Sequence, residues 1–252
     1  MSRFHEFSRE GILLAGGGRA ILLQLAHPAV GRGVARHSDF ARDALGRLHG
    51  TLAYVYAVAG GTPEDVRTVR RIVDRAHAPV RGDGYNAMDP ELQLWVAATL
   101  YDSAVLVHER VFGPLDGAVA DEVYVQYAEL GTALQMPAGL WPADRAAFRV
   151  WFDGRLDGVT VDDEVRRVAT TLLDRATLPW WLRPAAPTVR LLSTGLLPPE
   201  VRRAFALAWR PRDERALTRL LRVASIVYPR LPGLVRHAPE RYYLRRLRRS
   251  TR

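Results

Sequence analysis

The sequence contains neither cysteine nor lysine, and each absence limits what the protein can do. Without cysteine there is no disulfide, thiolate nucleophile, iron–sulfur cluster or cysteine-ligated zinc site, so any metal must be held by histidine, carboxylates or a cofactor. All 36 basic side chains are arginine. Because alanine, glycine, valine and leucine are also abundant, a GC-rich coding genome explains the arginine most simply, and the net charge of +9 is only weak evidence for a nucleic-acid partner.

Long apolar runs are also missing. The most apolar stretch, residues 92–107, is too short to span a bilayer and contains Asp102, which favours a buried central helix over a membrane helix. The N-terminal segment has no long apolar core and carries Glu6 and Glu10, unlike a secretory signal. We therefore expect a soluble, cytoplasmic protein.

Alternating strand patterns are nearly absent, and the best candidate is the short run 159–161. Helical periodicity dominates, with clear helix starts at Thr62-Pro63 and Asp89-Pro90, whereas the glycines of residues 81–86 favour a loop. We expect an all-α fold in which residues 1–252 form one compact multi-helix domain. The predicted helices are 4–14, 17–26, 43–59, 63–77, 90–112, 118–135, 143–154, 161–175, 186–195, 198–208 and 213–227.

The histidines are the most informative candidates for chemistry. His77 continues the inward face that Val69 and Val73 begin on the helix predicted at 63–77. An inward histidine is more often a hydrogen-bonded core residue than a metal ligand, so this pattern alone leaves both interpretations open. His27 stands before Pro28 at a helix boundary, where capping or a structural hydrogen bond is the simpler interpretation.

Three polar side chains share one face of the helix predicted at 43–59. Arg47, Thr51 and Tyr54 follow at spacings of four and three, so a guanidinium, a hydroxyl and a phenol lie among apolar neighbours. That arrangement suits the polar wall of a pocket. It equally suits a partly exposed helix whose arginine pairs with an acid, and the spacing alone does not separate the two interpretations.

Asp102 is the one acid inside the most apolar helix. A buried aspartate needs a charged partner or several hydrogen-bond donors, because an isolated charge is costly to remove from water. Arg19 or Arg47 is the expected partner. The alternative is that Asp102 borders a cavity and tunes a ligand there.

The C-terminal residues 241–249 mix tyrosine with arginine. This composition is typical of a nucleic-acid or membrane surface, and also of a frayed basic helix that packs its tyrosines and leucines on the body. Trp180 and Trp181 would add to a peripheral membrane contact if they share a face with this tail. We expect no nucleic-acid partner, because no helix-turn-helix signature or zinc-finger spacing accompanies the basic tail.

Four segments occur in an order that identifies a resemblance: GGGRAILLQLAHPAVGRGVARHSDF, LGRLHGTLAYVYAVAGGTPEDV, RAHAPVRG and YNAMDPELQLWVAATLYDS. Together they resemble the latex-clearing protein and MpaB-type oxygenase family. The similarity is strong over about residues 8–135 and loose beyond them. Members of this family are helical proteins, and those characterised bind haem b and use dioxygen.

The resemblance implies roles for five residues. His77, in the H-x-x-V-R-G motif, is similar to the proximal haem ligand of the family and would be the metal-binding residue. Arg47 and Thr51 match an arginine and a threonine kept four apart beside the haem, where they would bind the cofactor or act in catalysis. Tyr54 and His27 are further candidates for the cofactor pocket. The implied function is a haem-b-dependent oxygenase for an apolar small molecule, with dioxygen as co-substrate and an unspecified electron donor.

Two positions depart from the latex-clearing proteins. Those proteins place a lysine one residue before the threonine, where it can approach the iron, whereas this chain has Gly50 there and no lysine at all. They also carry an arginine three residues before the ligand histidine, where this chain has Asp74. Because these changes alter the charge of the pocket, polyisoprene cleavage is not carried over.

Two other functions stay open at this stage. The first is a non-catalytic protein of the same helical fold that binds haem or a lipid. The second is a non-haem iron enzyme in which His27, His37 and His77 converge, although the chain has no E-x-x-H pair of the kind used in bundle-type diiron sites.

Overall fold

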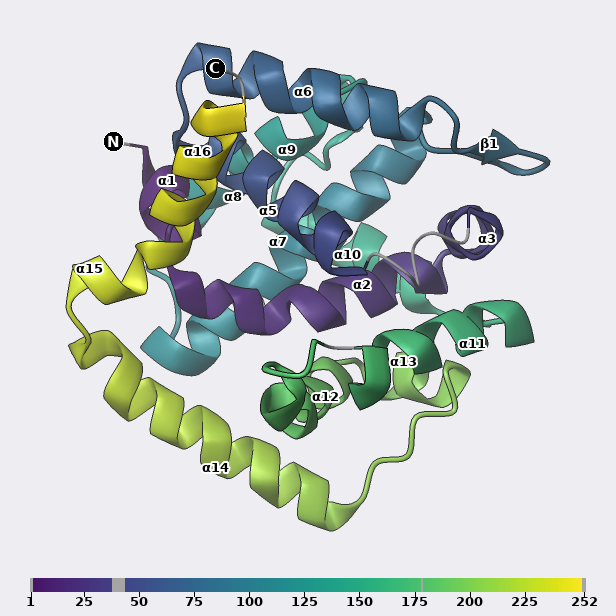
Figure 1. Ribbon diagram of the computed structural model, residues 1–252, viewed down its shortest axis with the longest axis vertical. Coiled ribbons are helices and arrows are strands. Elements are labelled where there is room, and N and C mark those ends of the chain that lie inside the picture. The colour runs from purple at the N-terminus through teal and green to yellow at the C-terminus, as the bar shows by residue number, and fades with distance from the viewer. Residues whose placement is uncertain (1, 38–43, 178, 251–252) are drawn as a thin grey trace.

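The computed structural model describes residues 2–37, 44–177 and 179–250, and these fold almost entirely into helices (Figure 1). The α-helices are α1 Arg3–Ser8, α2 Gly17–Ala26, α3 Pro28–Arg36, α5 Ala44–Gly60, α6 Pro63–His77, α7 Pro90–Phe112, α8 Gly117–Tyr127, α9 Glu129–Thr132, α10 Arg145–Leu156, α11 Asp163–Leu172, α12 Ala186–Gly195, α13 Pro199–Ala204, α14 Pro211–Val227, α15 Gly233–Arg236 and α16 Ala238–Ser250. Short 3-10 turns are η1 Gly11–Gly16, η2 Ala138–Leu140, η3 Arg175–Thr177, η4 Arg183–Ala185 and η5 Tyr228–Arg230.

The predicted all-α class is confirmed, and α2, α6, α7 and α12 begin and end at the predicted residues. The strongest helix starts follow the expected chemistry. At α6, the hydroxyl of Thr62 accepts from the backbone N–H of Asp65 at 3.2 Å, while the Asp65 carboxylate accepts from the N–H of Thr62 at 2.9 Å. This reciprocal cap satisfies two backbone donors that the helix itself leaves unpaired.

Several predicted boundaries are wrong. The helix predicted at 4–14 is split into α1 and η1, because Glu10 has an extended backbone and its carboxylate binds Arg236. The helix predicted at 118–135 divides into α8 and α9, and the predicted start at residue 43 lies outside the described residues. Helix α3 was not among the predicted helices, since its glycines obscure the periodicity. Helix α16 agrees with the interpretation of residues 241–249 as a basic helix, because its Tyr243 and Leu247 are buried on the body.

Residues 159–161, the best candidate for a strand pattern in the sequence, are irregular, which agrees with the predicted all-α fold. In the described part of the chain, the strands are instead β1 Arg81–Gly82 and β2 Tyr85–Asn86, paired antiparallel in the segment predicted as a loop. Gly84 takes a positive φ of 75° between them, a conformation that glycine adopts without steric cost. A hairpin this short leaves almost no strand pattern to detect.

Helix α7 runs through the middle of the molecule, and other helices pack around it (Figure 1). Its Trp95 and Tyr101 belong to a continuous buried core. Tyr101 meets Tyr127 and Phe148 edge-on, with ring centroids 5.2 and 5.0 Å apart, a favoured geometry for aromatic pairs. This arrangement confirms the buried central helix. Among the described helices, none has both the length and the apolar character that crossing a bilayer requires.

A buried ion pair joins α2 to α7. Arg19 contacts the Asp102 carboxylate at 2.6 Å, and both side chains are only 5% exposed, which confirms one of the two expected partners. Arg19 also donates to the hydroxyl of Ser103 and to the backbone oxygen of Leu196, both at 2.8 Å. Arg149 approaches Asp102 from the surface at 2.7 Å. Both buried charges are therefore paired and hydrogen-bonded, as burial requires.

We expect Asp102→Asn to lower the free energy of unfolding by about 3–5 kcal/mol, because it leaves the buried guanidinium of Arg19 without a counter-charge. Asp121→Asn is the matched control, since its carboxylate pairs with an arginine at the surface and its side chain is 66% exposed. That change is expected to cost less than about 1 kcal/mol. Urea unfolding measures the free energy of unfolding of both variants. Equal losses would contradict the view that a buried ion pair joins α2 to α7.

Candidate functional site

Helices α5 and α6 form an antiparallel pair joined by a tight turn (Figure 1). A Cβ atom at Gly61 would lie 2.5 Å from the backbone oxygen of Ala57, so the turn requires glycine. The capped start of α6 follows immediately at Thr62. Because the helices are antiparallel, residues near the start of α5 lie beside residues near the end of α6.

His77 is the last residue of α6, and its Nδ1 atom is buried. Within the described part of the chain, this atom has no hydrogen-bond partner. Burial, together with the positive charge of Arg47, lowers the pKa of His77, while Asp74 acts in the opposite direction. The imidazole is therefore neutral at pH 7, which is the protonation state that binds a metal.

An unpartnered buried ring nitrogen does not by itself identify a ligand, because His108 on α7 has one as well. The ring of His108 lies between Phe7 and Phe112, at centroid distances of 5.1 and 4.8 Å, and burial lowers its pKa. It is a core histidine surrounded by aromatic rings. His77 differs because the positive charge of Arg47 adds to burial in lowering its pKa, and because it ends its helix.

Arg47 and Thr51 lie on α5, and both side chains are exposed. Arg47 is close enough to His77 for its charge to lower the histidine pKa, so the structure brings these two predicted site residues together. Between Arg47 and Thr51, Gly50 faces open space: a Cβ atom built there meets nothing within 4 Å. The α5 helix thus presents an arginine and a threonine around an unobstructed position.

Tyr54 is placed differently from Arg47 and Thr51. Its ring is buried, and its hydroxyl donates to the backbone oxygen of Leu130 at 2.6 Å. Burial raises the pKa of Tyr54, with Asp74 as the next contribution. The phenol is therefore neutral and already engaged in the core, where it ties α5 to α9.

A polar network not anticipated from the sequence stands beside His77. The side-chain amide of Gln135 donates to the Asp74 carboxylate at 2.8 Å, and the amide of Gln93 donates to Gln135 at 2.5 Å. Gln93 is buried, and its side-chain oxygen accepts from the backbone N–H of Gln135 at 2.9 Å. The only sequence signal is Asp74 itself, which departs from the latex-clearing pattern. The two glutamines are 42 residues apart in sequence and follow no motif.

His27 lies at a separate hollow. Its Nδ1 accepts from the backbone N–H of Ala29 at 3.3 Å, so it caps α3 as the simpler interpretation expected. With Trp95, Arg155 and neighbouring residues it lines a hollow of about 200 Å³. Burial and then the charge of Arg155 lower its pKa. The charges acting on His27 differ from those acting on His77, and nothing in the described residues joins the two into one site.

In the described part of the chain, the histidines do not form a protein-only metal centre. Both ring nitrogens of His37 face backbone oxygens, of Gly33 at 3.0 Å and of Pro79 at 3.2 Å. Across residues 2–37, 44–177 and 179–250, no three histidine, aspartate or glutamate side chains form a group able to hold a metal ion. The described residues therefore give no support to the non-haem iron alternative.

Comparison with known proteins identifies the family of the chain. Residues 4–226 match the family described as ER-bound oxygenase mpaB/B′/Rubber oxygenase, catalytic domain. The chain belongs to this family. Uncharacterized proteins of Mycobacterium bovis and Mycobacterium tuberculosis are each 39% identical to it over 222 residues, covering 84% of this chain and 87% of theirs. No solved structure matches significantly.

Family membership confirms the predicted resemblance and extends it well beyond residue 135. It establishes that the chain carries an oxygenase-type catalytic domain. The match ends at residue 226, one residue before the end of α14, so α15 and α16 lie beyond the matched residues.

Gly50→Ala and Gly61→Ala test the geometry of α5 with opposite expected signs. Alanine at residue 50 is expected to stabilise the ligand-free protein by about 0.5–1 kcal/mol, because it favours the helix and meets no neighbour. Alanine at residue 61 is expected to destabilise it by about 1–3 kcal/mol, because of the clash with Ala57. Urea unfolding of both variants decides the matter, and destabilisation by Gly50→Ala would mean that this position is not open.

Proposed function

We propose that this protein is a haem-b-dependent oxygenase acting on an apolar small molecule, with His77 as the iron ligand. The observation that carries the proposal is the buried Nδ1 of His77, which has no hydrogen-bond partner among the described residues, on an imidazole whose pKa is lowered by burial and Arg47. The residue stands in the H-x-x-V-R-G motif of a chain that belongs to an oxygenase family.

The donor set favours haem over a free metal ion. A metal bound by protein alone needs three or more ligands, and no such group occurs among the described residues. Haem needs only one protein ligand, because the porphyrin supplies four nitrogen donors. A single neutral imidazole is therefore a sufficient attachment, and this is the chemistry that His77 offers.

The other residues of α5 would position the cofactor. Arg47 offers a fixed positive charge to a carboxylate such as a haem propionate, and this charge adds to burial in lowering the pKa of His77. Thr51 offers an exposed hydroxyl one turn further along the helix. Haem held by His77 would supply the chemistry that activates dioxygen. Tyr54 would support α5 from the core. His27, at its separate hollow, is a more remote candidate for the cofactor pocket.

The substrate class is inferred from the family, whose description includes a rubber oxygenase. Latex-clearing proteins have a lysine where this chain has Gly50. Glycine adds neither charge nor bulk between Arg47 and Thr51. Asp74 adds a negative charge near His77. Because of these differences, polyisoprene cleavage is not carried over, and the proposed substrate is an apolar small molecule.

Purified protein produced with added haem precursor is expected to show a stoichiometric Soret band, and His77→Ala is expected to abolish or strongly shift it. His108→Ala is the matched control, since it removes another imidazole with a buried, unpartnered Nδ1. That variant is expected to keep the band. Circular dichroism of both variants establishes that each is folded.

A colourless wild type that takes up no haem would overturn the proposal and favour a helical ligand-binding protein without oxygenase activity. A coloured wild type whose band survives His77→Ala unchanged would retain haem but reject His77 as its ligand.

A further inference from the structure

The last three helices carry nearly all the excess charge of the protein. Residues 211–249 contain 11 arginines and 3 acidic residues, so this stretch has a net charge of +8 out of +9 for the chain. Two of these acids already have partners: Glu240 is buried against His5, and Asp213 caps the start of α14. The excess of positive charge is therefore not neutralised within the stretch.

Helix α14 has one buried face and one exposed apolar face. Leu217 and Leu221 are buried against the body. Val223, Ile226 and Val227 point away from it, with exposed fractions of 58%, 52% and 50%. Their spacing of three and four residues places them on one side of the helix. Exposed arginines at 215, 219 and 222 accompany them.

The apolar exposure continues into the next two helices. Leu234 and Val235 on α15 are 75% and 55% exposed, and Tyr242 on α16 is 53% exposed. Isolated exposed aliphatic residues are ordinary on a protein surface, but a run of them along one connected segment indicates a contact surface. We call Val223, Ile226, Val227, Leu234, Val235, Tyr242 and the exposed arginines 215, 219, 222, 245 and 249 the α14–α16 surface.

A hollow of about 480 Å³ runs along α16, lined by Ala238, Arg241, Tyr242, Arg245, Arg246 and Arg249. Arg245 and Arg249 are exposed, and no carboxylate of the described residues lies within ion-pair distance of either. Guanidinium groups bind phosphate oxygens through two parallel hydrogen bonds. The hollow thus combines phosphate-binding groups with an exposed aromatic ring.

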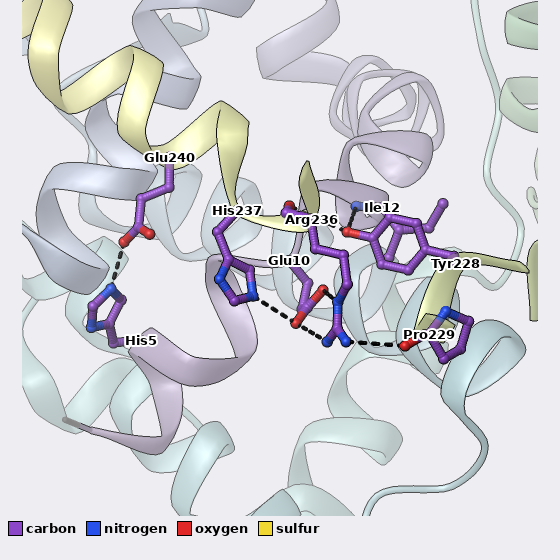
Figure 2. Close-up of polar contacts among 8 residues, drawn as sticks. All are labelled: His5, Glu10, Ile12, Tyr228, Pro229, Arg236, His237 and Glu240. Atoms are coloured by element: carbon purple, nitrogen blue, oxygen red, sulfur yellow. Dashed lines mark hydrogen bonds and ion pairs between the residues drawn. The ribbon is translucent and has the colours of Figure 1, made fainter. Parts of the chain in front are cut away.

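This surface is held in place by a partly buried polar cluster, shown in Figure 2. Arg236 and His237 both bind the Glu10 carboxylate, through Nε at 3.0 Å and Nε2 at 3.1 Å. Burial raises the pKa of Glu10, but the bonds from Arg236 and His237 outweigh it, and the net pKa is lowered. A second contact joins His5 to Glu240. The α15–α16 segment is therefore a docked part of the fold and not a loose tail.

We infer that the α14–α16 surface docks on an anionic lipid membrane. Arginine attracts the phosphate headgroups, and the exposed valine, isoleucine, leucine and tyrosine side chains enter the boundary beneath them. Nucleic acid would satisfy the arginines but would leave the aliphatic side chains in water, so the combination favours lipid. More than half of the surface lies beyond residue 226, outside the family match, and the inference does not depend on haem.

Flotation of the full-length protein with phosphatidylcholine vesicles, with and without phosphatidylglycerol, tests this inference. We expect binding to the anionic vesicles, much weaker binding to the neutral ones, and loss of binding at high salt. Arg245→Gln combined with Arg249→Gln is expected to weaken binding to anionic vesicles about tenfold. Arg67→Gln combined with Arg71→Gln is the control, because it removes the same charge at the same spacing from exposed positions on α6.

A second pair of variants tests the apolar contribution. Leu234→Ser combined with Val235→Ser is expected to reduce binding severalfold, whereas Val125→Ser combined with Val150→Ser is expected to leave it unchanged. The control residues are similarly exposed, at 63% and 77%, but lie on α8 and α10. Circular dichroism and urea unfolding establish that all four variants stay folded.

Three results would overturn the inference: no preference for anionic vesicles, equal losses in the test and control variants, or binding to duplex DNA in place of vesicles. The last result would assign the surface to nucleic acid. Because none of these measurements requires haem, their failure is distinguishable from failure of the proposed oxygenase function.

Discussion

The buried pairing of Arg19 with Asp102 is the constraint on which the rest of the structure depends. It fixes the crossing of α2 and α7, and through the Leu196 backbone it also fixes the turn after α12. Two charges that are 5% exposed tolerate little displacement, because moving either one leaves an unpaired charge in the core. Helix α7 is thereby held in one position, and the helices that pack against it take their places from it.

The candidate site is built at the edge of this core by a pair of helices with strong local signals. The Gly61 turn and the Thr62 cap fix the pairing of α5 with α6, which brings Arg47 to His77. Arg248 of α16 then binds Asp65 at 2.7 Å, at the start of α6. The segment that we assign to membrane docking is therefore bonded directly to the helix that ends at His77.

The sequence predicted those features that depend on local chemistry. Proline, aspartate and threonine caps located α6 and α7, because the capping groups lie within a few residues of the backbone donors that they satisfy. The inward orientation of His77 followed from helical spacing. Resemblance to the family supplied its role, since an inward histidine has no chemistry of its own that distinguishes a ligand from a core residue.

Features that depend on contacts between distant segments were not predictable in the same way. The bond between Gln135 and Asp74 joins residues 61 positions apart, and that between Arg236 and Glu10 joins residues 226 apart. Neither contact leaves a local pattern. The break between α1 and η1 has the same origin, because the carboxylate that binds Arg236 belongs to the residue where the helix is interrupted. Tyr54 was placed on the correct helix. Its hydrogen bond to Leu130 was not predictable, because it depends on where α9 packs.

The central claim is that the imidazole of His77 holds haem iron, and chemical rescue tests it most directly. The absorption spectrum of His77→Gly, reconstituted with haem, should lack the wild-type Soret band and regain it when free imidazole is added, because the small ligand occupies the space of the missing side chain. A His77→Gly spectrum identical to that of the wild type before imidazole is added would contradict the claim.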